Sequence, residues 1–182
     1  DSLYNRGKTP KVSEMEVTPK ELGMRYALGT KKVLGKNLMG TIQNEGVEAA
    51  VAFCNERAYP LTDSMSMNFN ARIKRVSDKP RNPKNQANAI ELAHIETFKG
   101  QVAGGASVQP ILREENGKVY FYYPIVTNTM CLNCHGTPEQ NITQKVYKSL
   151  SELYPQDKAI GYGPNEVRGI WSIVFDTPRK TD

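Results

Sequence analysis

Residues 108–126, VQPILREENGKVYFYYPIV, constrain the fold of this chain more than any other segment. Two runs rich in aliphatic and aromatic residues flank Glu115-Asn116-Gly117, and such residues favour strands. Asn-Gly is the strongest short signal for a two-residue hairpin turn, because both positions of that turn need positive φ angles. The segment therefore predicts two antiparallel strands joined by a tight turn, and a fold that contains a sheet.

A long helix is expected well ahead of this hairpin. Thr18 can cap it, Pro19 suits the first helical position, and Glu21 completes a capping box. We expect this helix to run to about Asn44. Residues 1–17 are polar and unpatterned, and we expect them to form a flexible leader.

A second helix is expected over residues 46–58. Its apolar residues fall on one continuous face, which is made of Val47, Ala50, Val51, Cys54 and Ala58. This spacing predicts that Cys54 points into the core and not to water. Pro60 is expected to end the helix or to kink it.

The rest of the chain alternates between strand and helix signals. Strands are expected over 71–77 and 166–175, helices over 87–98 and 142–154, and a loop over 78–86, where two prolines fall. Helices packed on a small antiparallel sheet make an α+β fold. A single domain is expected over residues 18–182.

Composition narrows the classes of function. The net charge is +5 and the sequence pI is about 9.1, but the lysines and arginines are scattered apart from 72–75 and 79–84. Nucleic-acid binding would need a denser basic stripe, so we expect no nucleic-acid partner. An acidic redox protein is a weaker expectation from the same charge. No apolar run is long enough for a membrane span, and any export signal has been removed or was never present.

The chain has three cysteines and two histidines, and it concentrates Cys131, Cys134 and His135 in the sequence CLNCH. Cys-x-x-Cys-His is the attachment sequence of c-type haem. Two thiols add across the two vinyl groups of the porphyrin, and the following histidine lies beneath the iron and supplies an axial nitrogen. The motif therefore predicts one covalently bound haem c.

Three other uses of these cysteines fit less well. A thioredoxin-like redox pair would open a helix after a strand in a βαβ unit, whereas this motif leads into Gly-Thr-Pro. A zinc site would need a fourth ligand, and outside the motif the chain offers Cys54 and His94. A disulfide between cysteines three residues apart would close too small a loop to constrain the chain.

The second axial ligand stays open on the residues alone. Cys54 is either a small buried hydrophobic residue or a thiolate ligand. His94 would give bis-histidine ligation, whereas Met65 or Met67 would give a His/Met pair of higher potential. An open sixth position would allow a small molecule to bind.

The sequence resembles a family of PAS-like c-type haem domains that was long catalogued as a domain of unknown function. The resemblance covers roughly residues 20–176. It rests on the helix VEAAVAFCNERAYP, the segment RIKRVSDKPRNPKNQANAIEL, the paired strands and then CLNCHG, in that order. Membership implies a PAS-like antiparallel sheet flanked by helices, with His135 as the proximal ligand and Cys54 as the distal one.

The haem propionates need cationic or hydrogen-bonding neighbours, and we expect Arg75, Arg81 and Asn82 to contact them, because arginine–carboxylate pairs are strong. The alternative for these residues is a solvated surface loop. Aromatic residues are expected to pack around the porphyrin or within the sheet, namely Phe121, Tyr123 and Trp171. A thiolate ligand would stabilise ferric iron and give a low potential.

The expected function is an exported monohaem c-type cytochrome that carries electrons, located in the periplasm or an equivalent lumen. The alternative is a haem-based redox or gas sensor, which the PAS-like architecture favours. A haem enzyme ranks lower, because it would need an open iron face and His94 as acid/base. The expected partner is a redox protein, and the apolar positions of the first helix serve a homodimer as well as a core.

Overall fold

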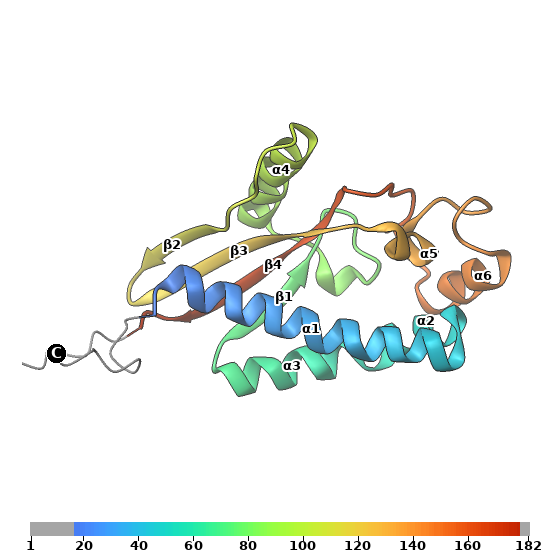
Figure 1. The fold of residues 1–182 in the computed structure, drawn as a ribbon, viewed down its shortest axis with the longest axis horizontal. Coiled ribbons are helices and arrows are strands. Elements are labelled where there is room, and N and C mark those ends of the chain that lie inside the picture. Colours follow the sequence, from blue (N-terminus) through green and yellow to red (C-terminus); the bar gives the residue numbers. More distant parts are fainter. Residues whose placement is uncertain (1–16, 179–182) are drawn as a thin grey trace, which may run out of the picture.

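A four-stranded antiparallel sheet in the order β1-β4-β3-β2 organises the fold, in a computed structural model that describes residues 17–178 (Figure 1). Its strands are β1 (Arg72–Val76), β2 (Ile111–Glu115), β3 (Lys118–Val126) and β4 (Val167–Asp176). The predicted hairpin is formed by β2 and β3, and its turn residues Asn116 and Gly117 have φ angles of 51° and 75°. These are the positive angles that such a turn requires. The α+β prediction is confirmed.

The long first helix, α1 (Pro19–Glu45), begins at the predicted residue. The Thr18 hydroxyl oxygen accepts a hydrogen bond of 3.2 Å from the backbone N–H of Glu21. The helix contacts β3 and β4, and Gly23 allows a close approach, because a Cβ atom there would lie 2.1 Å from the Phe121 ring. The predicted leader, residues 1–17, lies outside the described residues except for Val17.

The segment after α1 forms two helices, where the sequence analysis predicted one. Helix α2 (Val47–Glu56) follows Gly46, whose φ of 91° separates it from α1, and α3 (Ala58–Phe69) follows directly. Pro60 does not end the helical segment, because it lies in the first turn of α3, where proline's missing N–H has no helical partner to lose. Helix α3 contacts α1, α2 and β1.

Helices cover both faces of the sheet (Figure 1). Alternation along β3 places Phe121 in the core beneath α1 and α3 and Tyr122 in the core beneath α4. Helix α4 (Ala89–Ala103) starts in a capping box formed by Asn88 and Glu91, and it runs five residues beyond the predicted end. The two faces therefore carry separate apolar clusters.

A third apolar cluster lies beyond the end of the sheet opposite the hairpin, where α6 (Gln144–Leu153) packs against α2 (Figure 1). Its buried members are Val51, Ile142, Val146, Leu150 and Tyr154. Between this cluster and the sheet, the chain forms the 3-10 turns η2 (Pro83–Asn85) and η3 (Thr129–Cys131) and the short helix α5 (Leu132–His135). Among residues 17–178, no helix combines the length and apolar character needed to cross a bilayer.

Candidate functional site

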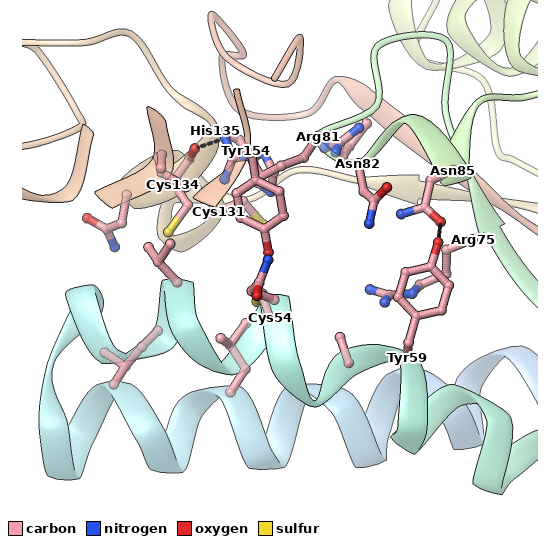
Figure 2. Close-up of a pocket in the computed structure, with 18 of the residues that line it drawn as sticks. Cys54, Tyr59, Arg75, Arg81, Asn82, Asn85, Cys131, Cys134, His135 and Tyr154 are labelled. Atoms are coloured by element: carbon pink, nitrogen blue, oxygen red, sulfur yellow. Dashed lines mark hydrogen bonds between the residues drawn. The ribbon is translucent and has the colours of Figure 1, made fainter. Parts of the chain in front are cut away.

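A partly open cavity lies between α2, the η3–α5 segment, α6 and the loop after β1 (Figure 2). It holds about 1070 Å³ of space free of protein atoms, including its mouth. Its apolar wall includes Leu38, Ile42, Val51 and Leu150. Seven of the candidate residues expected from the sequence line this one cavity, namely Cys54, Arg75, Arg81, Asn82, Cys131, Cys134 and His135.

A short helical stretch presents the cysteines and the histidine to the cavity. The side chain of Asn128 accepts a hydrogen bond of 3.1 Å from the N–H of Cys131 and so caps the turn. Residues three and four positions apart share one side of a helix, which places Cys134 and His135 on the same side as Cys131. After them, Gly136 donates to the carbonyl of Leu132 and ends the helix. The local sequence therefore suffices to group the three side chains.

His135 is held in one orientation by the segment that precedes β4. Its Nδ1 atom lies 2.8 Å from the carbonyl oxygen of Ala159, and the N–H of Tyr162 donates to the carbonyl of His135 at 2.9 Å. Because a carbonyl can only accept, Nδ1 carries the proton and Nε2 keeps its lone pair. Burial, aided by the charges of Arg168 and Arg81, lowers the pKa of His135 well below its usual value. The ring is therefore a neutral imidazole ready to bind a metal.

Cys54 does not point into the core as the helical spacing predicted. Its neighbours on that face, Val51 and Ala58, are buried, whereas Cys54 is exposed and lines the cavity. Although Cys54 is exposed as a residue, the surrounding protein displaces enough water to raise the pKa of its thiol, against the opposing charges of Arg75 and Arg81. Burial likewise raises the pKa of Cys134 to about 11. All three cysteines are free thiols.

The arginines of the cavity differ in how their charges are satisfied. Arg81 donates to the carbonyls of Cys134 and Ala159, and its Nε lies 3.2 Å from Asp157. Arg168 donates to the Ser77 hydroxyl at 2.8 Å and to the carbonyl of Lys79. The Arg75 side chain has neither a hydrogen bond nor an ion pair with any residue of 17–178, and burial lowers its pKa. An anion in the cavity would satisfy it.

Asn82 and two tyrosines complete the polar wall. The Asn82 side chain accepts a hydrogen bond of 3.0 Å from the N–H of Lys84 and so caps η2. Tyr59 donates to the side chain of Asn85, and Tyr154 directs its hydroxyl group toward α2 near Cys54 (Figure 2). Burial raises the pKa of Tyr154 to about 12, so its phenol stays protonated.

Two further residues belong to the site although the sequence did not point to them: Arg168, which lines the cavity, and Ala159, which contacts His135 from behind it. Arg168 is the single charged residue in the apolar strand VRGIWSIVF, and this could have marked it, because arginine is rarely buried unless it has a partner. No comparable signal marks Ala159, which acts through its backbone carbonyl.

The other candidate ligands lie elsewhere. The His94 ring stacks against Tyr122 with centroids 4.3 Å apart, on the α4 side of the sheet. Met65 packs against the core under α1, and Met67 is 82% exposed on α3. None of these three lines the cavity. Within residues 17–178, no group of three or more His, Cys, Asp or Glu side chains could hold a metal ion, as a protein-only zinc site would need.

The aromatic residues expected near the porphyrin pack within the sheet. Phe121 and Trp171 are buried in the core beneath α1, and Tyr123 is partly buried against the same core. A second hollow adjoins the cavity and shares Cys131 and His135 with it. Its lining includes Ile125 and Val126 at the end of β3, and it includes none of the three aromatic residues.

Comparison with known proteins gives two matches. The sequence profile of the Tll0287-like family (Tll0287) matches residues 11–175. Among solved structures, the fold is similar to the crystal structure of the cyanobacterial haem protein Tll0287, with a TM-score of 0.63 and 18% sequence identity. That similarity covers 91% of this chain and 100% of the other. No curated protein sequence matches significantly.

Proposed function

Because the chain belongs to the Tll0287-like family, we propose that it is an exported monohaem c-type cytochrome that carries electrons at low potential. The observation that carries this proposal is the meeting of two free thiols, a neutral imidazole and a third thiol in one cavity. The structural relative is itself a haem protein, which supports the same cofactor here.

The residues of the cavity fit a covalently bound haem. Cys131 and Cys134 would form the two thioether bonds, and His135 would present Nε2 to the iron while Ala159 holds Nδ1. Bound in this way, the haem supplies a reversible one-electron couple. The apolar wall formed by α1, α2 and α6 would exclude water from the macrocycle.

Cys54 is the proposed distal ligand. It reaches the cavity from α2, across from the α5 segment that carries His135 (Figure 2). His94, Met65 and Met67 do not line the cavity, which leaves Cys54 favoured among the ligands considered. A thiolate must lose its proton to bind, and the positive charges of the metal, Arg75 and Arg81 all favour that loss. Thiolate ligation would stabilise the ferric state and lower the potential.

Arg75 is the proposed principal partner of the propionates. Its guanidinium group lines the cavity without a partner in the described part of the chain, and a carboxylate would compensate a charge that is costly to leave unpaired. Arg81 and Asn82, also on the wall, already make protein contacts and would contribute less.

Thioether formation is tested first. The chain is produced with haem-maturation machinery and examined by pyridine haemochrome and by haem staining after denaturation. We expect one haem per chain, retained in the wild type and in Cys54→Ser and lost in Cys131→Ser/Cys134→Ser. Wild-type chain that releases its haem on denaturation would refute covalent attachment.

A haem-based redox or gas sensor is the second candidate. It is favoured by the solvent access of Cys54 and the open mouth of the cavity, since an accessible distal thiolate could be displaced. A PAS-like reading of the antiparallel sheet with its flanking helices fits the same role. Rapid stoichiometric CO binding by the reduced protein would favour a sensor, and its absence would favour a closed electron carrier.

Compartment and partner follow from the cofactor. Covalent haem attachment takes place outside the cytoplasmic membrane, so we propose a periplasmic or equivalent lumenal location and a redox protein as partner. Fractionation of cells that express the native gene tests the location; haem-loaded protein in the cytoplasmic fraction would contradict it.

A further inference from the structure

We propose that Arg81 is a positioning residue that raises the redox potential of the site by competing with His135 for the carbonyl oxygen of Ala159, and that Asp157 limits this effect. The inference rests on the proposed function, because it concerns the metal that His135 would bind. It gives Arg81 a role different from the propionate contact expected from the sequence.

The geometry links the three residues to the histidine in a closed set of contacts. The Ala159 carbonyl oxygen lies 2.8 Å from His135 Nδ1 and 3.0 Å from Arg81 Nη2. Asp157 accepts a hydrogen bond of 2.8 Å from the N–H of Ala159 through Oδ1, and its Oδ2 lies 3.2 Å from Arg81 Nε. Arg81 also donates to the carbonyl of Cys134. One side chain thus connects the haem motif, the carbonyl beneath His135 and a carboxylate.

A carbonyl oxygen that accepts from two donors shares its electron density between them. The guanidinium is the charged donor, so it weakens the bond from His135 Nδ1. A weaker bond at Nδ1 makes the imidazole less basic and a poorer electron donor to iron through Nε2. The positive charge of Arg81 also disfavours the more positive ferric state. Both effects raise the potential.

Asp157 acts in the opposite direction. Its carboxylate is an ion-pair partner of Arg81 Nε, although the contact does not have the geometry of a hydrogen bond. The side chains of Arg81 and Asp157 are only 11% and 12% exposed, so water and salt screen the two charges weakly. The electrostatic influence of Arg81 on the site is therefore reduced but not cancelled.

Midpoint potentials of haem-loaded variants test the inference. We expect Arg81→Gln to lower the potential and Asp157→Asn to raise it, with Arg81→Lys between Arg81→Gln and the wild type. Arg113→Gln and Glu115→Gln are the matched controls, because their ion pair has the same 3.2 Å separation but lies on the hairpin, away from the cavity. Neither control should shift the potential measurably.

A spectroscopic signature separates tuning from simple bracing of the loop. In the reduced protein with ¹⁵N-labelled histidine, Arg81→Gln should move the Nδ1 resonance of His135 toward stronger hydrogen bonding, because its competitor is gone. A residue that only braced the loop would give the opposite shift.

The outcomes are distinguishable. Wild-type chain without bound haem would refute the proposed function itself. Haem-loaded protein in which Arg81→Gln and Asp157→Asn shift the potential in the same direction, or no more than the hairpin controls, would overturn this inference alone. Should Arg81→Gln fail to fold, Asp157→Asn and Arg81→Lys decide, since a wild-type potential in both would also overturn it.

Discussion

The two ends of the sheet differ in whether their charged side chains are paired. At the hairpin end, Lys118 lies 2.6 Å from Asp176 and Arg113 lies 3.2 Å from Glu115, and these pairs are about half exposed or more. At the cavity end, Arg75 projects into a largely apolar hollow without an ionic partner among residues 17–178. At the hairpin end the protein itself supplies the partner of each of these charges. At the cavity end the charge of Arg75 would be compensated by a further group.

The contrast separates residues that stabilise the fold from residues that bind. Side chains at the core of the sheet gain their free energy from packing against each other. Cavity residues such as Cys54 and Arg75 gain little from the protein alone, because burial opposes their charged forms. Substitutions at the two ends should therefore have effects of different kinds.

The largest effect on stability is expected in the core of the sheet. Phe121 is fully buried beneath Gly23, so Phe121→Ala should lower the free energy of unfolding by about 3–5 kcal/mol. The absorption spectrum of the remaining folded protein should not change. Denaturant unfolding measures the first quantity, with the half-buried Tyr123→Phe as a mild control. A changed haem spectrum in folded Phe121→Ala would break the proposed separation of the two ends.

The largest effect on the cofactor is expected at Cys54. Removing an anionic donor destabilises ferric iron, so Cys54→Ala should raise the midpoint potential within the range of roughly 0.8 V that axial ligands span. The low-spin thiolate spectrum should be lost as well. Ala52→Ser, on the same helix but outside the cavity lining, is the control. An unchanged spectrum and potential in Cys54→Ala would remove Cys54 from the ligand set.

Substitution of Arg75 should change the free energy of unfolding in a direction that depends on whether haem is bound. In haem-loaded protein, Arg75→Met should cost about 1.5–3 kcal/mol, the usual contribution of a hydrogen bond to a charged group. In the haem-free Cys131→Ser/Cys134→Ser background, the same change should be neutral or stabilising, because it removes an unpaired, desolvated charge. Chemical unfolding of both forms provides the measurement. Arg72→Met, exposed on the same strand, should have little effect in either, and equal losses in both forms at Arg75 would contradict a propionate contact.

The smallest effect is expected from His94, on the face of the sheet away from the cavity. Desolvation, followed by the charge of Arg113, lowers its pKa below 6.5. The unfolded chain therefore binds this proton more readily than the folded chain does. The stability that His94 contributes is fully present above about pH 6.5 and is lost as pH falls toward its folded pKa. His94→Gln should flatten this part of the pH profile of haem-loaded protein, in which His135 would be ligated. An identical profile in the variant would assign the slope to other groups.

Sequence reasoning succeeded where the causes are local. Asn116-Gly117 specifies its own turn, Thr18 and Pro19 specify a helix start, and the spacing of Cys131, Cys134 and His135 groups them without help from the rest of the fold. These features depend on neighbours within a few residues.

It failed where distant segments decide. Helix α3 was not predicted because a proline inside a helical segment usually marks a helix end. Here a new helix begins at Ala58, which places Pro60 in its first turn. Cys54 shares the apolar spacing of its helix, but the outward side of α2 at that position faces a cavity that α6 and α5 enclose. The contact of Ala159 with His135 joins residues 24 positions apart and uses a backbone carbonyl. Every residue type has such a carbonyl, so the sequence gives no signal for it.

That last contact has a consequence in time. The chain is made from its N-terminus, so Cys131, Cys134 and His135 are synthesised before Ala159 and Tyr162, which hydrogen-bond to His135. Strand β4 follows these residues in the chain and lies between β1 and β3 in the sheet. Before both have folded, the cavity is not closed on the side of Ala159 and Tyr162. A chain that emerges from its N-terminus during the proposed export would thus offer its attachment sequence as an open loop before residues 159–176 close the cavity, which would let haem attachment precede final folding.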